Sequence, residues 1–136
     1  MNHALDFLRQ KGLSHAGKKA DRVTSEGAIC SYIHSGGKVG VLIEINCETD
    51  FVARNDEFQA FAKEIALHIA GSVPPPKYLR KEDAPPDAVP HEVCLMEMPF
   101  IKDTSVTIGD IVTQKIAKMG ENIIIRRFIR YKLGEA

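Results

Sequence analysis

The side chains best suited to recognition chemistry lie together in residues 46–58, which read NCETDFVARNDEF. Several oxygen-bearing side chains in this stretch could cap a helix, among them Thr49, Asp50, Asn55 and Asp56. Such side chains accept hydrogen bonds from the free amides of a first helical turn, so the stretch predicts a helix start after a strand. Phe51 stands among them, and aromatic side chains displayed on loops often anchor protein contacts.

Two interpretations of Phe51 and its neighbour Val52 follow from this pattern. In the first, both side chains turn back onto the core and staple the start of the helix. In the second, a loop displays Phe51 together with Asp50 toward a partner protein. The pattern of residues alone leaves both interpretations open.

No part of the sequence predicts covalent catalysis or a bound metal ion. Cys30, Cys47 and Cys94 form no CxxC pair, and the five histidines are scattered, so no metal-ligand spacing occurs. The glycines around Gly36 precede a strand pattern and lack a following Lys-Ser or Lys-Thr, which favours a hairpin turn over a phosphate loop. We therefore expect no enzyme activity, no cofactor and no metal, and reduced cysteines of the kind found in the cytosol.

Charge and hydropathy narrow the class of protein further. The 136 residues include 18 Lys and Arg and 18 Asp and Glu, a net charge of zero that argues against a general nucleic-acid binder. No apolar run has the length of a membrane-spanning helix, and no signal-peptide pattern is visible. We expect a cytoplasmic protein, or an organellar matrix or stromal protein if the source is eukaryotic.

The residue pattern divides the chain into two parts. Residues 1–22 predict a short N-terminal helix, at 3–11, and a basic linker. Residues 23–136 predict a core domain. A proline-rich connection at 72–90 interrupts this domain and holds six of the seven prolines, which excludes a regular helix throughout.

Hydrophobic periodicity in the core domain predicts a hairpin, two helices and two further strands. The hairpin strands are 27–34 and 38–46, around the turn Ser35-Gly36-Gly37; the helices are 55–70 and 107–119, the second capped by Thr107; the further strands are 92–98 and 122–133. This order predicts an α+β fold. It would consist of a β-hairpin–helix–strand antiparallel sheet with helices packed on one face, followed by a C-terminal helix–strand unit.

The last strand, at 122–133, is expected to alternate between two faces. One face, interrupted by Arg127, would carry Ile123, Ile125, Ile129, Tyr131 and Leu133. The other would carry Arg126, Phe128, Arg130 and Lys132. Three interpretations of the second face stay open: a half-exposed basic surface, an interface with a partner, or an RNA-binding sheet with Phe128 as a stacking platform.

The stretch NCETDFVARNDEF closely resembles the signature of translation elongation factor Ts. The segment GKKADRVTSEGAICSYIHSGGKVGVLIEINCETDFVARN resembles the start of that family's core domain, and TIGDIVTQKIAKMGENIIIRRFIRYKLGE resembles its C-terminal end. The resemblance covers residues 12–73 and 93–135. It implies two departures from the family, because most of a small N-terminal helical domain and a central insertion, in the region of 72–90, are absent.

The resemblance implies a guanine-nucleotide exchange factor for elongation factor Tu, which promotes GDP release by disturbing the Mg²⁺ and switch region of that partner. Asp50 and Phe51 would act on the partner, while Thr49 and Val52 hold the loop in shape. Rim or structural positions would be Arg54, Asn55 and Asp56. Short family members work as homodimers, sheet against sheet. The alternatives are a docking module for elongation factor Tu with little exchange activity and an RNA-binding α+β domain.

Overall fold

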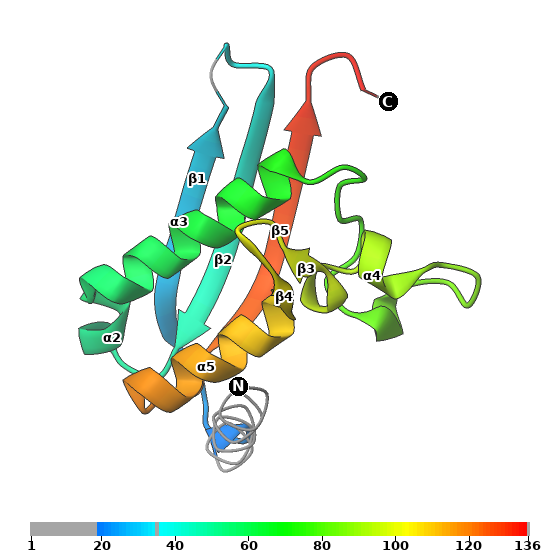
Figure 1. The fold of residues 1–136 in the computed structure, drawn as a ribbon. Coiled ribbons are helices and arrows are strands. Elements are labelled where there is room, and N and C mark those ends of the chain that lie inside the picture. Colours follow the sequence, from blue (N-terminus) through cyan, green and yellow to red (C-terminus); the bar gives the residue numbers. More distant parts are fainter. Residues whose placement is uncertain (1–18, 35, 136) are drawn as a thin grey trace.

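Three antiparallel strands form the central sheet of this protein. The computed structural model describes residues 19–34 and 36–135, so the helix predicted at 3–11 lies outside the described residues. The strands follow the order β1-β2-β5 and comprise β1 (Glu26–Ile33), β2 (Val39–Cys47) and β5 (Ile124–Lys132). β1 and β2 form the predicted hairpin, and β5 pairs with the other edge of β2 (Figure 1).

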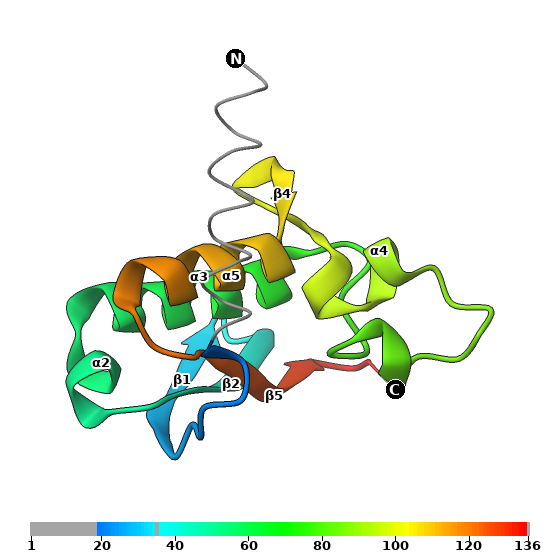
Figure 2. The ribbon, with the colours of Figure 1, turned by 90° about the horizontal axis from the view of Figure 1, so that it is seen from below.

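Two long helices cover one face of the sheet and leave the other face open (Figure 2). They are α3 (Asp56–Gly71) and α5 (Ile108–Met119), and both confirm predicted helices. Thr107 caps α5 as expected, because its hydroxyl accepts the amide proton of Asp110 at 3.1 Å. In return the Asp110 carboxylate accepts the amide proton of Thr107 at 3.0 Å. The α+β class is therefore confirmed.

The remaining elements are short and lie between the long ones. They are α2 (Asp50–Arg54), the 3₁₀ turn η1 (Lys81–Asp83), α4 (Pro90–Val93), the 3₁₀ turn η2 (Leu95–Glu97), β3 (Pro99–Phe100) and β4 (Asp103–Thr107). β3 and β4 pair with each other as a separate two-stranded ribbon. Within the proline-rich connection at 72–90, the 3₁₀ turn η1 is a brief helical interruption of an otherwise irregular path.

The strand predicted at 92–98 is wrong. The segment instead ends α4 and forms η2, and the amide of Leu95 donates to the carbonyl of Tyr78 at 2.8 Å. Consecutive side chains of the segment are buried, since Cys94 and Leu95 are both 0% exposed. A short apolar run of this kind does not distinguish a strand from a buried turn. The third place in the sheet belongs to β5, from the C-terminal helix–strand unit.

The hydrophobic core lies between α3, α5 and the covered face of the sheet. The fully buried side chains of α3 recur at helical spacing, as predicted: Phe58, Phe61, Ala62, Ile65, Ala66 and Ile69. They form one cluster with Val41, Ile43 and Ile45 of β2 and with Ile108, Ile111, Val112 and Ile116 of α5. Burial of this apolar surface is the main stabilising contribution in a domain of this size.

A β-bulge in β5 changes which side chains of that strand face the core. Glu44 of β2 lies opposite Arg127, but the next residue, Ile45, lies opposite Ile125. Two steps along β5 thus match one step along β2, and Arg126 is the extra residue. An extra residue shifts the alternation of side chains by one position beyond the bulge.

The two faces predicted for the last strand are therefore wrong beyond Arg126. Ile125 is buried, as expected, but Ile129 and Tyr131 are 43% and 70% exposed on the open face of the sheet. Phe128 instead packs partly buried against the core. The predicted alternation assumed a regular strand, and no local feature of the residues announces the bulge.

His68, near the end of α3, is a polar side chain inside the core, only 1% exposed. Its Nδ1 accepts the amide proton of Ile101 at 3.1 Å, and its Nε2 lies 3.3 Å from the hydroxyl oxygen of Ser72. The Ser72 hydroxyl donates its own proton to the carbonyl of His68 at 2.6 Å. These partners suit a neutral ring with its proton on Nε2. Burial lowers the pKa of His68 to about 4.

We expect the free energy of unfolding to fall as the pH drops from about 6.5 to about 4. The unfolded chain takes up a proton near the ordinary histidine pKa of 6.5, whereas folded His68 does so only near 4. The contribution is therefore complete above pH 6.5 and is lost progressively below it. Urea unfolding followed by circular dichroism across this range measures the decline.

The matched variant for this experiment is His68→Asn. The asparagine oxygen can accept the Ile101 amide proton, but the side chain does not titrate. The variant should therefore lose less stability than the unaltered protein between pH 6.5 and pH 4. An equal decline in the two proteins would contradict the assignment.

Candidate partner-binding site

The residues predicted to act on a partner lie on α2, a helix of 5 residues between β2 and α3. Thr49 precedes α2 in an extended conformation and caps it, because its hydroxyl accepts the amide proton of Val52 at 3.4 Å. The segment expected to be a loop is therefore a helical turn. Its backbone hydrogen bonds fix the direction in which each side chain leaves the chain.

Asn55 joins α2 to α3 and serves both helices. Its amide donates to the carbonyl of Val52 at 3.0 Å, which closes α2. Its side-chain oxygen accepts the amide proton of Glu57 at 2.8 Å, which caps α3. The side-chain amide of Gln59 then donates back to the carbonyl of Ala53 at 2.6 Å. Hydrogen bonds to residues of both α2 and α3 thus fix the angle between the two helices.

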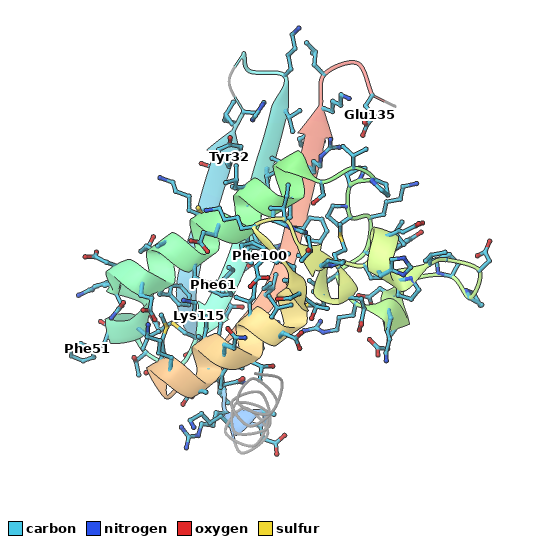
Figure 3. All side chains as sticks on the ribbon, in the orientation of Figure 1. Tyr32, Phe51, Phe61, Phe100, Lys115 and Glu135 are labelled. Carbon is cyan, nitrogen blue, oxygen red and sulfur yellow. The ribbon has the colours of Figure 1, made fainter. Side chains whose placement is uncertain are left out.

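Phe51 points away from the body of the protein at the α2 corner (Figure 3). Its side chain is 84% exposed, whereas Ala53 is buried and Val52 packs partly against the core. The staple interpretation is therefore wrong for Phe51 and holds only for Val52. A single helical turn directs its side chains around a full circle, so it cannot bury all of them against one core.

Asp50 and Arg54 form an ion pair along α2, with 3.5 Å between carboxylate oxygen and guanidinium nitrogen. Their side chains are 52% and 82% exposed. Solvent screens an ion pair this open, so it adds little to stability. The Asp50 side chain, next to Phe51 in the sequence, is thus about half exposed to solvent.

The turn that precedes α2 is held by the turn that joins α5 to β5. The Glu121 carboxylate accepts the amide protons of Glu48 and Thr49 at 3.1 and 3.0 Å and the hydroxyl proton of Thr49 at 2.6 Å. In return, the Glu48 carboxylate accepts the amide proton of Asn122 at 2.5 Å. We call this group of four residues (Glu48, Thr49, Glu121 and Asn122) the carboxylate clamp.

Asn122 extends the carboxylate clamp to the segment before β1. Its side-chain amide donates to the carbonyls of Ala20 and Arg22 at 3.3 and 3.1 Å, and the Arg22 guanidinium lies 3.6 Å from the Glu48 carboxylate. Sequence reasoning missed Glu121 and Asn122 because 73 positions separate Glu121 from Glu48. Local spacing predicts a helix end before Glu121, but it does not predict what the following turn contacts.

A second polar contact ties the start of α3 to the end of α5. The Lys118 ammonium lies 2.6 Å from the Glu57 carboxylate, and that of Lys115 lies 3.9 Å from it. The hydrogen bond from Lys118 lowers the pKa of Glu57. The two helices are thus joined on the same side of the molecule that carries the carboxylate clamp.

Cys47 lies just before the carboxylate clamp and is fully buried. Its thiol donates to the carbonyl of Thr49 at 3.2 Å. Burial, and next the charge of Glu121, raise the pKa of the thiol to about 11. The sulfur is therefore protonated at neutral pH and acts as a weak donor within the fold rather than as a nucleophile.

Residues 19–34 and 36–135 also lack the features of two other kinds of site. In these ranges no group of three or more His, Cys, Asp or Glu side chains is arranged to hold a metal ion. No helix in the same ranges is long and apolar enough to cross a membrane.

A family model described as Elongation factor TS matches residues 16–97, which include α2 and the strands and helix around it. The Elongation factor Ts of Carboxydothermus hydrogenoformans is 46% identical over 167 aligned positions, which cover 99% of this chain and 76% of that protein. The chain belongs to the elongation factor Ts family. The Elongation factor Ts of Methylacidiphilum infernorum is 42% identical, with 99% of this chain and 81% of that protein covered.

Membership in the elongation factor Ts family places the chain in protein biosynthesis, at translation elongation. It confirms the resemblance inferred from NCETDFVARNDEF and the two longer segments. The 167 aligned positions exceed the 136 residues of the chain, so the relative carries residues that this chain lacks. This agrees with the prediction of a shortened family member.

The same substitution should change stability by very different amounts at two phenylalanines near the site. Phe58→Ala empties a fully buried position and should reduce the free energy of unfolding by about 3–5 kcal/mol. Phe51→Ala removes an exposed ring and should change it by less than about 0.5 kcal/mol. Urea denaturation measures both values, and a large loss in Phe51→Ala would contradict the placement of that ring outside the core.

Proposed function

We propose that this protein is a guanine-nucleotide exchange factor for elongation factor Tu that promotes GDP release by disturbing the Mg²⁺ and switch region of that partner. The observation that carries the proposal is Phe51, 84% exposed on a helical turn whose two ends are capped. Membership in the elongation factor Ts family supports a role in the same process.

Exposure alone would not identify Phe51 as a contact residue, because single apolar side chains are common on protein surfaces. What distinguishes Phe51 is the support beneath it. Thr49 and Asn55 cap the two ends of the turn, and Val52 and Ala53 attach it to the core. A turn held in this way loses little backbone freedom on binding, which favours affinity.

Nucleotide exchange sets a thermodynamic requirement that such a ring can meet. A factor that weakens the binding of GDP to its partner must itself bind the nucleotide-free partner more tightly, by the same ratio. It therefore has to contact a conformation in which the Mg²⁺ and phosphate contacts are broken. Phe51 would gain buried area by inserting between elements of that conformation. The Asp50 carboxylate would compete for donors or repel the phosphate oxygens near the metal.

The other predicted site residues support this turn rather than extend it. Thr49 and Val52 set its shape by capping and packing. Asn55 caps α3, and Asp56 begins that helix with an acidic side chain in its first turn, where negative charge is favourable. Arg54 pairs with Asp50 along the turn and would sit at the rim of the contact.

The two alternatives to exchange activity differ in how much support they have. A docking module that binds elongation factor Tu with little exchange would use the same surface, so only a rate measurement separates it from the proposal. An RNA-binding sheet would need Phe128 on the open face as a stacking platform. Phe128 packs against the core instead, so no observation favours that alternative.

The test is the rate at which a fluorescent GDP leaves elongation factor Tu in the presence of this protein. We expect acceleration by the unaltered protein and a loss of most of it in both Asp50→Ala and Phe51→Ala, because each removes one half of the proposed contact. Val73→Ala, at a position 95% exposed and away from α2, is the matched control for removing exposed apolar surface. Glu64→Ala, on the exposed side of α3, is the control for removing a carboxylate.

Two results would reject the proposal. If the unaltered protein binds elongation factor Tu but does not accelerate release, the chain is a docking module. If Phe51→Ala and Asp50→Ala accelerate release as well as Val73→Ala and Glu64→Ala do, another surface carries the activity.

The open face of the sheet supports a second proposal, a homodimer in which two copies pair sheet against sheet. Five apolar side chains on this face are at least 43% exposed: Ile29, Ile33, Leu42, Ile129 and Tyr131. The strand register places Leu42 directly opposite Ile129. A contiguous apolar patch on a sheet is a typical protein contact surface, and two identical patches can bury each other around a twofold axis.

Sedimentation velocity tests the homodimer. The unaltered protein should sediment as a dimer, and Leu42→Lys should shift it to a monomer, because each copy would then bury an unpaired ammonium group in the contact. Val73→Lys adds the same charge at an exposed apolar position outside the sheet and should stay dimeric. A monomeric unaltered protein at micromolar concentration would reject the homodimer and leave the exchange proposal untouched.

A further inference from the structure

Glu121 follows α5 in the sequence and contacts the turn before α2, which carries Asp50 and Phe51. α5 ends at Gly120, which has a φ of 76°, a left-handed conformation that glycine adopts at little cost. The chain turns there, and the next residue lies against the turn that precedes α2. Glu121 is also outside residues 16–97, the part of the chain that the family model matches.

The hydroxyl of Thr49 makes two hydrogen bonds that depend on each other. It donates its proton to the Glu121 carboxylate at 2.6 Å and accepts the amide proton of Val52 at 3.4 Å. A hydroxyl has a single proton, so donation to Glu121 leaves its lone pairs to accept from α2. Glu121 therefore orients the side chain that caps α2.

Two more bonds from Glu121 fix the backbone at the same point. Its carboxylate accepts the amide protons of Glu48 and Thr49 at 3.1 and 3.0 Å. Hydrogen bonds to an ionised acceptor are shorter and stronger than those between neutral groups. Asp50, the first residue of α2, follows Thr49 directly. The position of the Glu121 carboxylate therefore determines the direction in which the chain enters α2.

We infer that Glu121 is a positioning residue of the exchange site, which fixes, through Thr49, the direction in which α2 presents Asp50 and Phe51 to the partner. The inference rests on the proposed exchange function and deepens it. It gives the α5–β5 turn a part in nucleotide release although that turn does not belong to the motif.

Orientation matters here because the ring and the carboxylate have to meet the partner together. A small displacement of a group that must fit a strained conformation can lower a rate by as much as about a hundredfold, as enzymes show. The ion pair between Asp50 and Arg54 lies within α2 and turns with it, so it cannot supply this orientation. The carboxylate clamp joins the start of α2 to a separate part of the fold and can supply it.

The test measures GDP release at increasing concentrations of this protein, which separates the limiting rate from the half-saturating concentration. Glu121→Ala should lower the limiting rate about tenfold, within the range usual for coupling between two sites. Glu121→Gln should keep the limiting rate within about twofold, because its oxygen still accepts both amide protons and its amide group can donate to the Thr49 hydroxyl. Glu64→Ala, which removes a carboxylate outside the motif, should behave like the unaltered protein.

A purely structural role predicts a different result. A variant that is only less stable contains less folded protein, which raises the half-saturating concentration and leaves the limiting rate unchanged. That outcome for Glu121→Ala would overturn the inference while Phe51→Ala still tests the proposed function on its own. A limiting rate in Glu121→Gln as low as in Glu121→Ala would also overturn it, because hydrogen-bond geometry would then not be the cause.

If Glu121→Ala does not fold, Glu121→Asp replaces it. Aspartate keeps the charge but is one methylene shorter, so it cannot reach both amides and the hydroxyl of Thr49 at once. The limiting rate should then fall by several fold, with faster amide hydrogen exchange at Phe51 and Val52 in the free protein. An unchanged limiting rate in Glu121→Asp would overturn the inference. Failure of the unaltered protein to accelerate release would overturn the proposed function, and the inference with it.

Discussion

Burial of one face of the sheet under α3 and α5 is the constraint on which the rest of the structure depends. Ile43 and Ile45 of β2 face Phe58 and Phe61 of α3 within one cluster, so the register of β2 and the rotation of α3 are set together. A slip of one residue would turn every side chain of the strand to the opposite face. The segment between β2 and α3 must therefore make a fixed corner, and α2 is the turn that makes it.

Polar bonds then give that corner its orientation. The carboxylate clamp joins the end of β2 to the turn after α5, and Asn122 carries the connection on to the segment before β1. The apolar core alone would hold α2 only through Val52 and Ala53, which leaves its rotation weakly determined. A stiff support reduces the conformational entropy lost when an exposed side chain binds, and beneath Phe51 that stiffness comes largely from the hydrogen bonds at the two ends of α2.

One extra residue at Arg126 determines the character of the opposite surface. Without the bulge, Ile129 and Tyr131 would continue the core side begun by Ile125; with it, both lie on the open face. The same shift takes Phe128 into the core and places Arg127 opposite Glu44, 2.8 Å from its carboxylate. The molecule therefore offers two separate surfaces, an apolar sheet face and the α2 corner, built from different residues.

The sequence by itself determined the elements whose signals are local. Apolar spacing predicted α3 and α5, turn glycines predicted the hairpin of β1 and β2, and oxygen-bearing side chains at Thr49, Asn55 and Thr107 predicted helix caps. The motif around Asp50 and Phe51 could also be found from sequence, because its residues are contiguous. The strand expected at 92–98 failed, since a short apolar run fits a buried turn as well as a strand.

Only the tertiary structure decided the exposure of Phe51, the faces of β5 and the partners of Glu121. Whether an aromatic ring beside a helix start turns inward depends on which neighbouring side chains occupy the core. In α2 these are Val52 and Ala53. The bulge is a property of pairing between two strands, and the carboxylate clamp joins residues 73 positions apart. Local patterns describe what a segment can do, but long-range contacts select among those states because burial and hydrogen bonding are satisfied only in the complete fold.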